Sequence, residues 1–147
     1  MTEASEIKTK PHLTNRIIAG IIDYGIICSF SFTLIFTLGT PDNDGTYHLD
    51  GFPALIPIVF WGIMTIGLEQ WFGATLGNSI AGLKPISING FRNNLTFGQS
   101  FKRHLLDPVD MFFFGLVGYI NIKNTEKNQR LGDLWAKTIV VDKNQTN

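Results

Sequence analysis

Two long apolar runs dominate the first half of the chain. Residues 17–38 form 22 positions with a single charged residue, Asp23. As a helix this run would extend about 33 Å, which matches the roughly 30 Å thickness of the hydrocarbon core of a membrane. Residues 52–72 form a second run of 21 positions, and its one charge, Glu69, lies close to the end. We therefore predict two membrane-spanning helices, with Pro57 bending the entry to the second.

A third apolar segment is shorter. From Leu105 to Ile122 it is just long enough to span, but its apolar stretch after Asp110 covers only residues 111–120. That length is more typical of a re-entrant or interfacial segment. Two alternatives stay open: the segment dips into the membrane and returns, which we favour, or it crosses.

The basic residues predict an orientation. All twelve Lys and Arg residues lie before the first run, between residues 73 and 104, or in the tail after residue 122. The loop 39–51 holds three aspartates and no basic residue. The positive-inside rule therefore places the N-terminus in the cytoplasm and this loop outside. The same rule places the tail inside, as a returning third segment requires.

The polar segments predict short elements at the cytoplasmic surface. Leu76, Ile80 and Leu83 are at helical spacing, which predicts a short interfacial helix over residues 76–83. The segment KPISIN alternates polar and apolar residues, and TIVV near the C-terminus is a second β-like run, so we predict that these two strands pair. The expected fold is an all-α transmembrane protein, a small polytopic helical bundle: a single domain over residues 13–142, with tails at 1–12 and 143–147.

Composition excludes several classes of function. Only 16% of the 147 residues are charged, against roughly 25% in soluble domains. Twelve basic and twelve acidic residues cancel, so nucleic acid is not an expected partner. A single cysteine, Cys28, excludes a disulfide framework. The chain has no P-loop, no zinc-binding motif and no pairing of a nucleophile with a base, so we expect no enzyme activity, no cofactor and no metal site.

Charged residues inside the apolar runs are the candidate functional residues. An ionised aspartate at the centre of a bilayer costs at least roughly 2.5–3.5 kcal/mol, so Asp23 is the main candidate and Glu69 the second. Arg16 lies two helical turns before Asp23, on the same helix face. Two interpretations stay open: Asp23 pairs with a basic residue of a neighbouring segment, such as Arg103 or Arg130, or it binds a proton or small cation.

Acidic residues nearer the C-terminus have more modest expected roles. Asp107 and Asp110 are expected to mark where the third segment meets the membrane interface. Towards the end of the chain we expect a helical turn that Asp133 caps, or in which Asp133 pairs with Arg130 or Arg103.

Three segments together carry a family resemblance: NRIIAGIIDYGI, GATLGNSIAGLKPISINGFRNNLTFGQSFKRHLL and QRLGDLWAKTIVV. In this order, from about residue 12 to residue 142, they resemble the RDD family of small, mainly bacterial membrane proteins, named for one arginine and two aspartates. The resemblance maps these three onto Arg16, Asp23 and Asp133, with Arg103 at a further basic position. Two residues near the expected strands depart from the family pattern: Lys137 stands where a glycine is usual, and Pro85 interrupts a Leu-Arg-Val-Val-like stretch.

The resemblance implies a bacterial inner-membrane protein with transporter-like architecture, in a family suggested to move unknown ligands and, for some members, to exchange sodium and protons. We expect Asp23 to bind or release a proton or small cation, Glu69 to assist, and Arg16 or Arg103 to act as the competing counter-ion. These four residues and Asp133 are expected to form one cytoplasmic cluster. Two or three helices are few to enclose a pathway, so this function requires a homo-oligomer in the lipid bilayer. The alternative is a non-catalytic membrane interaction or assembly module, in which the charged cluster is structural.

Overall fold

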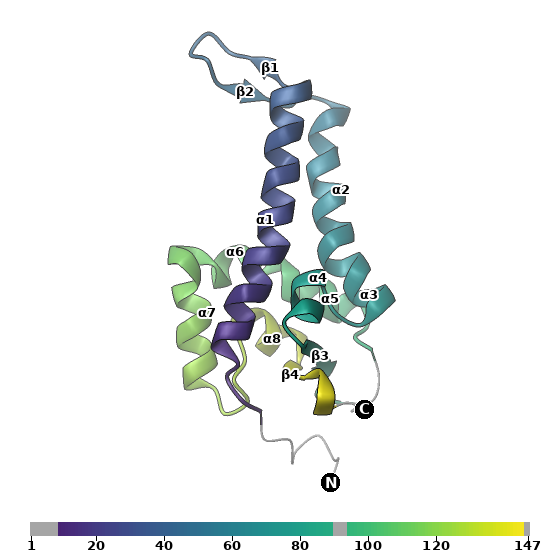
Figure 1. Ribbon diagram of the computed structural model, residues 1–147, viewed down its shortest axis with the longest axis vertical. Helices are drawn as coiled ribbons and strands as arrows, with labels where there is room; N and C mark the ends of the chain where they lie inside the picture. Colours follow the sequence, from purple (N-terminus) through teal and green to yellow (C-terminus); the bar gives the residue numbers. More distant parts are fainter. Residues whose placement is uncertain (1–8, 90–93, 146–147) are drawn as a thin grey trace.

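Two long antiparallel helices form a hairpin that rises above the rest of the molecule (Figure 1). The computed structural model describes residues 9–89 and 94–145. The first arm of the hairpin is a single helix. The second arm begins with a 3-10 turn and contains one π-helical turn. In chain order these elements are α1 (Leu13–Leu38), η2 (Phe52–Leu55), α2 (Ile56–Gly62), η3 (Ile63–Gly67) and α3 (Leu68–Phe72).

Both arms are long and apolar enough to cross a membrane. The mean hydropathy is 1.8 for the most apolar window of Leu13–Leu38 and 1.7 for that of Phe52–Phe72. Only 17% of each window is buried inside the molecule, so large apolar side chains such as Phe32 and Ile58 point outward. Such a surface is suited to lipid rather than to water. The two predicted spans are confirmed, and the chain is a multi-pass membrane protein.

A two-stranded hairpin closes the far end of the two arms. Strand β1 (Thr40–Pro41) pairs antiparallel with β2 (Tyr47–His48). The imidazole of His48 lies between two carboxylates, with Nδ1 2.9 Å from Asp42 Oδ2 and Nε2 2.8 Å from Asp50 Oδ2. All three side chains are exposed. The acidic loop that the sequence places on one side of the membrane is thus a short ordered hairpin.

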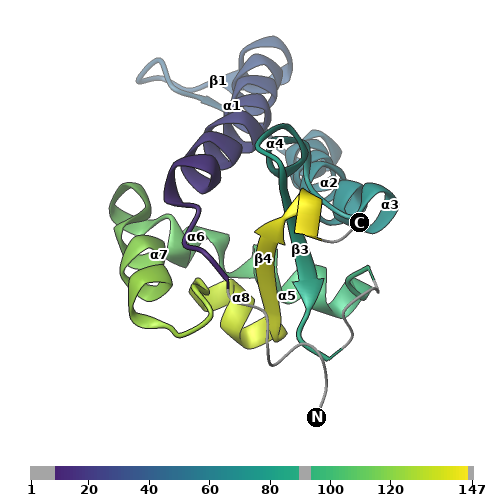
Figure 2. The same cartoon turned by 60° about the horizontal axis from the view of Figure 1, so that its bottom comes forward.

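The opposite end of the two arms, where α1 begins and α3 ends, is called the basal end below. The rest of the described chain gathers there as short helices around a second two-stranded sheet (Figure 2). These elements are α4 (Leu76–Ile80), β3 (Leu83–Ser87), α5 (Phe97–Leu105), α6 (Asp107–Asp110), α7 (Phe112–Asn124), α8 (Leu131–Ala136), β4 (Thr138–Asp142) and η4 (Lys143–Gln145).

The predicted pairing of two short strands is confirmed. Strands β3 and β4 run antiparallel, with Leu83 opposite Asp142 and Ser87 opposite Thr138. Pro85 stands opposite Val140. Backbone hydrogen bonds join Lys143 N to Gly82 O and Ile88 N to Lys137 O. Because hydrogen-bonded and non-hydrogen-bonded pairs alternate along an antiparallel ladder, Pro85 lies in a non-hydrogen-bonded pair and needs no N–H group. The proline is therefore compatible with the strand.

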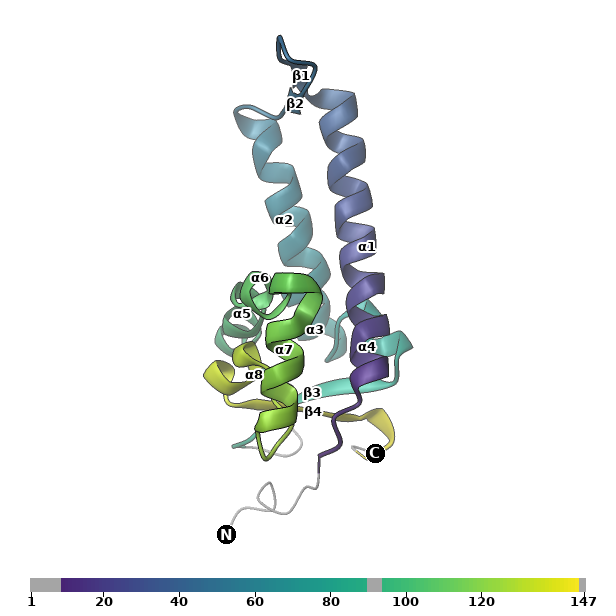
Figure 3. The same ribbon diagram turned by 90° about the vertical axis from the view of Figure 1, so that its left-hand side faces the viewer.

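The third apolar segment is bent rather than straight. The axis turns by 117° between Phe97–Asp110 and Phe112–Asn124 (Figure 3). Left-handed backbone at Phe113, Phe114 and Gly115 accompanies the bend. The segment lies between β3 and β4 in the chain, and these strands pair with each other at the basal end. Strands on opposite sides of a membrane cannot pair, so this arrangement agrees with a segment that returns to the side from which it came.

Two expected elements differ in extent. The predicted helix over residues 76–83 ends at Ile80, and Leu83 is a fully buried residue of β3 instead. Gly82, with φ of +72°, turns the chain between the two elements, which the helical spacing of apolar residues does not reveal. The predicted tails lie partly outside the described residues, at 1–8 and 146–147.

Candidate functional site

Arg103 on α5 stands at the centre of a buried group of charged side chains. Its side chain is 1% exposed and lies between two carboxylates that are each 0% exposed. Arg103 Nε donates to Asp133 Oδ1 at 2.8 Å, and Nη1 donates to Glu69 Oε2. The other oxygen of Glu69 accepts from Ser100 Oγ at 2.8 Å. A buried ion pair is tolerated only when its hydrogen bonds are satisfied, as they are here. These contacts connect α3, α5 and α8 through the side chain of Arg103.

Asp133 gathers three arginines. Its Oδ2 lies 3.3 Å from Arg16 Nη1 and accepts from the backbone N–H of Arg130, and Arg130 Nε lies 3.8 Å from Oδ1. Burial alone would raise the pKa of Asp133, but the positive charges of Arg103, Arg130 and Arg16 outweigh it and hold the pKa well below its usual range. Asp133 therefore stays ionised. The two roles considered for it, capping α8 and pairing with arginine, occur together.

His104 connects this group to a second set of polar side chains. Its Nε2 lies 3.1 Å from Glu69 Oε2, and its Nδ1 lies 2.7 Å from Asp107 Oδ2. Tyr24 on α1 donates its hydroxyl to the same Asp107 oxygen at 2.6 Å. An imidazole donates to two carboxylates at once only when it is protonated. The result is a continuous hydrogen-bonded path from Glu69 through His104 and Asp107 to Tyr24.

Arg130 and Asp110 complete the arrangement. Arg130 Nη1 lies 2.9 Å from Asp107 Oδ1, and its Nε lies 4.0 Å from Asp110 Oδ2. Burial disfavours the charge of Arg130, but the surrounding carboxylates of Asp107, Asp133 and Asp110 outweigh this and raise its pKa above the ordinary value. Asp110 also accepts from the backbone N–H groups of Leu131 and Gly132, at 3.0 Å each. The charged cluster comprises Arg16, Glu69, Arg103, His104, Asp107, Asp110, Arg130 and Asp133.

Asp23 has a different environment from the cluster. It is 6% exposed, its Oδ2 accepts from Thr75 Oγ1 at 2.6 Å, and its Oδ1 accepts from the Gly77 N–H at 2.7 Å. These neutral donors belong to the start of α4, which packs tightly on α1. The interpretation that Asp23 pairs with Arg103 or Arg130 is wrong, because α4 occupies the space beside Asp23 and both arginines contact other carboxylates.

The structure brings four of the five residues singled out from the sequence into one cluster, and Asp23 lies beside it. Asp107 and Asp110, expected at the membrane interface, are buried members of the cluster. His104 was not singled out at all. The signal available in the sequence was a polar stripe at helical spacing just before an apolar run. That stripe consists of Arg103, His104, Asp107 and Asp110.

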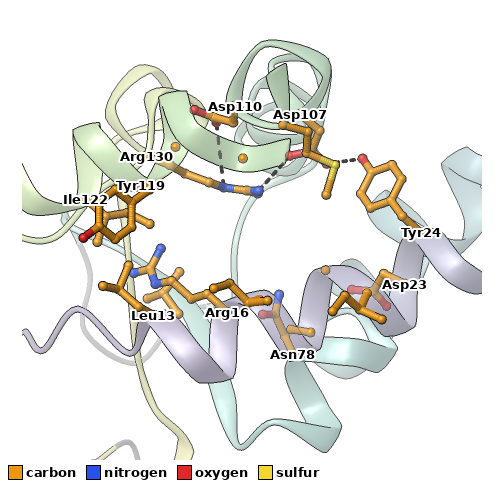
Figure 4. A pocket seen from close by; sticks show the side chains of 18 of the residues that line it. Leu13, Arg16, Asp23, Tyr24, Asn78, Asp107, Asp110, Tyr119, Ile122 and Arg130 are labelled. Carbon is orange, nitrogen blue, oxygen red and sulfur yellow. Dashed lines mark hydrogen bonds and ion pairs between the residues drawn. The ribbon is translucent and has the colours of Figure 1, made fainter. Parts of the chain in front are cut away.

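A cavity of about 730 Å³ lies between α1, α4 and the bend of α6 and α7. In Figure 4, Arg16 and Asn78 point into it from one side and Arg130 from the other, with Asp23 and Tyr24 at one end. Apolar residues of α1 and α7 form the remaining walls. Within residues 9–89 and 94–145, no group of three or more His, Cys, Asp or Glu side chains is placed to hold a metal ion.

The comparisons with known proteins give one match. A model described as the RDD family matches residues 10–137, which reach from the residues just before α1 to the end of α8. The match includes the arginine and the two aspartates that the resemblance maps onto the family name, and it covers most of the chain. Curated proteins and solved structures give no match. Since the family model spans both membrane arms and nearly all of the basal end, the chain belongs to the RDD family.

Proposed function

We propose that this protein moves a proton or a small cation across the membrane through its buried carboxylates. The observation that carries this proposal is the charge balance at the basal end. Among the described residues, five buried carboxylates meet only three arginines and one histidine there. Even with His104 protonated, one negative charge remains. The carboxylates are Asp23, Glu69, Asp107, Asp110 and Asp133.

An uncompensated carboxylate in a buried site is unfavourable, and it is relieved by a proton or by a cation. Asp23 is the best position for this exchange, because its hydrogen bonds come from the neutral donors Thr75 and Gly77. It also lines the cavity, which gives a cation access to it. Arg16, on the same face of α1, is the counter-ion that competes with the bound cation.

The His104 path supports a proton as the transported ion. It links Glu69, which is fully buried, to Asp107 and Tyr24. His104, Asp107 and Tyr24 all line the cavity. A histidine between two carboxylates can pass a proton from one to the other, so Glu69 assists by exchanging protons with the cavity through His104.

The proposal includes an orientation and an assembly. The distribution of basic residues favours a cytoplasmic N-terminus and basal end in a bacterial inner membrane. Two spans cannot enclose a pathway by themselves, so a homo-oligomer is needed. The exposed apolar faces of α1 and α2 are available for contacts between copies.

Reconstituted vesicles test this function. We expect purified wild-type protein to dissipate an imposed proton or sodium gradient, and Asp23→Asn to reduce the flux at least about tenfold, since an amide takes up neither a proton nor a cation's charge. The asparagine oxygen can accept from the Gly77 N–H while its amide donates to the Thr75 hydroxyl, so under this proposal we expect the fold to be retained. Asp44→Asn, in the exposed hairpin, is the matched control. No flux from a correctly folded wild-type oligomer would overturn the proposal.

A non-catalytic assembly module is the second candidate. It is favoured by the internal contacts of the cluster, in which Glu69, Asp107 and Asp133 each contact an arginine within the chain. In this case the cluster stabilises the basal end so that it can bind a partner. Asp23→Asn would then weaken folding or assembly, and neither wild type nor variant would carry ions.

A further inference from the structure

Arg16 has a hydrogen-bond donor that the described chain does not use. Its Nη1 donates to Asp133 at 3.3 Å and its Nη2 donates to Asn128 O at 3.0 Å. The buried Nε has no acceptor among the described residues. A guanidinium edge with a free N–H is well suited to the oxygens of a phosphate. The side chain of Asn78 points into the same cavity from α4 (Figure 4).

The carboxylates around the cavity are already engaged by donors of the chain. Asp107 accepts from Tyr24, contacts His104 and lies beside Arg130. Asp110 accepts from two backbone N–H groups of α8. The unused donor is therefore on Arg16, while the carboxylates exceed the cations by one charge. A zwitterionic ligand supplies an anionic group for Arg16 and a cationic group that keeps this anion from adding to the negative charge already present.

The remaining walls of the cavity are apolar and reach the outer surface. Ile17 and Ile21 line it from α1, and they are 59% and 68% exposed. Leu116 lines it from α7 and is 50% exposed. Because α1 spans the membrane, side chains exposed on this part of its surface are suited to acyl chains. The cavity thus joins a polar interior to an apolar mouth.

We propose that this cavity binds a zwitterionic phospholipid with a primary ammonium group, taken from the surrounding bilayer. The phosphate accepts from Arg16 Nε and from the Asn78 amide. The ammonium is attracted by the net negative charge of the buried carboxylates without displacing their existing donors, and one acyl chain follows Ile17 and Ile21 out of the mouth. This site goes beyond the proposed ion transport, and a bound lipid is detected in the absence of any gradient.

Native mass spectrometry of the full-length protein, stripped of lipid in detergent, tests the proposal. The probes are dioleoyl phosphatidylethanolamine, dioleoyl phosphatidylglycerol, which lacks the ammonium, dioleoylglycerol, which lacks the phosphate, and inorganic phosphate. We expect one phosphatidylethanolamine to bind per chain. It should bind at least about tenfold more tightly than dioleoyl phosphatidylglycerol or dioleoylglycerol, because each of these lacks one charged contact. Inorganic phosphate alone is expected not to bind.

Two variants locate the site. Arg16→Lys keeps a positive charge for Asp133 but lacks the Nε donor, and Asn78→Leu removes an amide whose side chain has no hydrogen bond among the described residues. Each is expected to weaken phosphatidylethanolamine binding about tenfold. Lys102→Gln, on α5 and away from the cavity, is the control and should bind as wild type does. The proposal would be overturned if the wild-type protein bound all three lipids, or the two phospholipids, with equal affinity. It would also be overturned if wild type and both variants bound phosphatidylethanolamine equally.

Discussion

At the scale of single residues, Asp133 is the carboxylate on which the three arginines converge. Replacing it with asparagine removes the counter-charge of Arg103 and Arg16 while preserving the shape of the side chain. Because a buried charge left without its partner is strongly unfavourable, we expect Asp133→Asn to lower the free energy of unfolding by about 3–5 kcal/mol. Denaturant unfolding in detergent micelles, followed by tryptophan fluorescence, measures this. A loss below about 1 kcal/mol would contradict a central role for this ion pair.

The same carboxylate predicts a pH dependence of stability. The pKa of Asp133 in the folded protein is below its unfolded value, so its contribution is present above the unfolded pKa and is lost as the pH falls through the folded pKa. We expect the wild-type unfolding free energy to decrease below about pH 4, and to do so less steeply in Asp133→Asn. Identical slopes for the two proteins over this interval would show that Asp133 does not contribute.

Gly77 is a residue at which the backbones of α1 and α4 lie close together. A Cβ atom there would lie 2.1 Å from Ala19 O and 2.8 Å from Asp23 Oδ2. Gly77→Ala is therefore expected to destabilise the protein by about 1–3 kcal/mol, since neither backbone can move without breaking the Asp23 hydrogen bonds. Gly98→Ala on α5, where a Cβ meets nothing within 4 Å, is the matched control and should cost no stability. Equal thermal stability of the two variants would contradict this packing.

At the scale of elements, the junction of α8 and β4 contains a residue in a conformation that suits glycine. Lys137 has φ of 55° and ψ of 53°, and its side chain is exposed. Lys137→Gly is expected to raise the free energy of unfolding, by up to about 1 kcal/mol, because the strain of the left-handed backbone exceeds the extra entropy of the unfolded chain. Lys137→Ala keeps the strain and should show no gain. Thermal unfolding of both variants in the same detergent measures the difference.

Elements defined by periodic patterns were predictable, and those defined by local backbone geometry were not. Long apolar runs predict α1 and the second arm, and alternation predicts the strand that contains Ile86. The bend at Phe113 and Phe114 occurs inside an unbroken apolar stretch that contains no proline, so the sequence does not indicate it. The π-helical turn over Ile63–Gly67 likewise has no signal in the hydrophobic pattern, which is long enough for a regular helix.

The candidate site was predictable where charge identifies its members. Arg16, Glu69 and Arg103 are conspicuous because ionised groups next to apolar runs need partners, whereas Asp133 is identified by the resemblance to the RDD family. The partners of Asp23 were not predictable, because they are a hydroxyl and a backbone N–H more than fifty residues away in the chain. Such neutral donors occur everywhere in a sequence, and only the close packing at Gly77 selects these.

At the scale of the whole molecule, the pairing of β3 with β4 places both ends of the described chain on one side of the membrane. Single cysteines at Asn43 and Asn144, in a protein with Cys28 replaced by serine, test this topology. We expect a membrane-impermeant maleimide to label Asn43Cys from one side of sealed vesicles and Asn144Cys from the other. Labelling of both cysteines from the same side would mean that the chain crosses the membrane an odd number of times, or that the two helical arms do not cross it.

The ion pair between Arg16 and Asp133 joins residues that are 117 positions apart. During translation the first helix leaves the ribosome with its arginine long before the matching aspartate is synthesised. Until α8 is synthesised, the nascent chain must keep Arg16 in water, among lipid headgroups or beside the insertion machinery, whereas Arg103 can already pair with Glu69. A chain cut short before α8 would therefore enter the bilayer with Arg16 lacking its carboxylate partner.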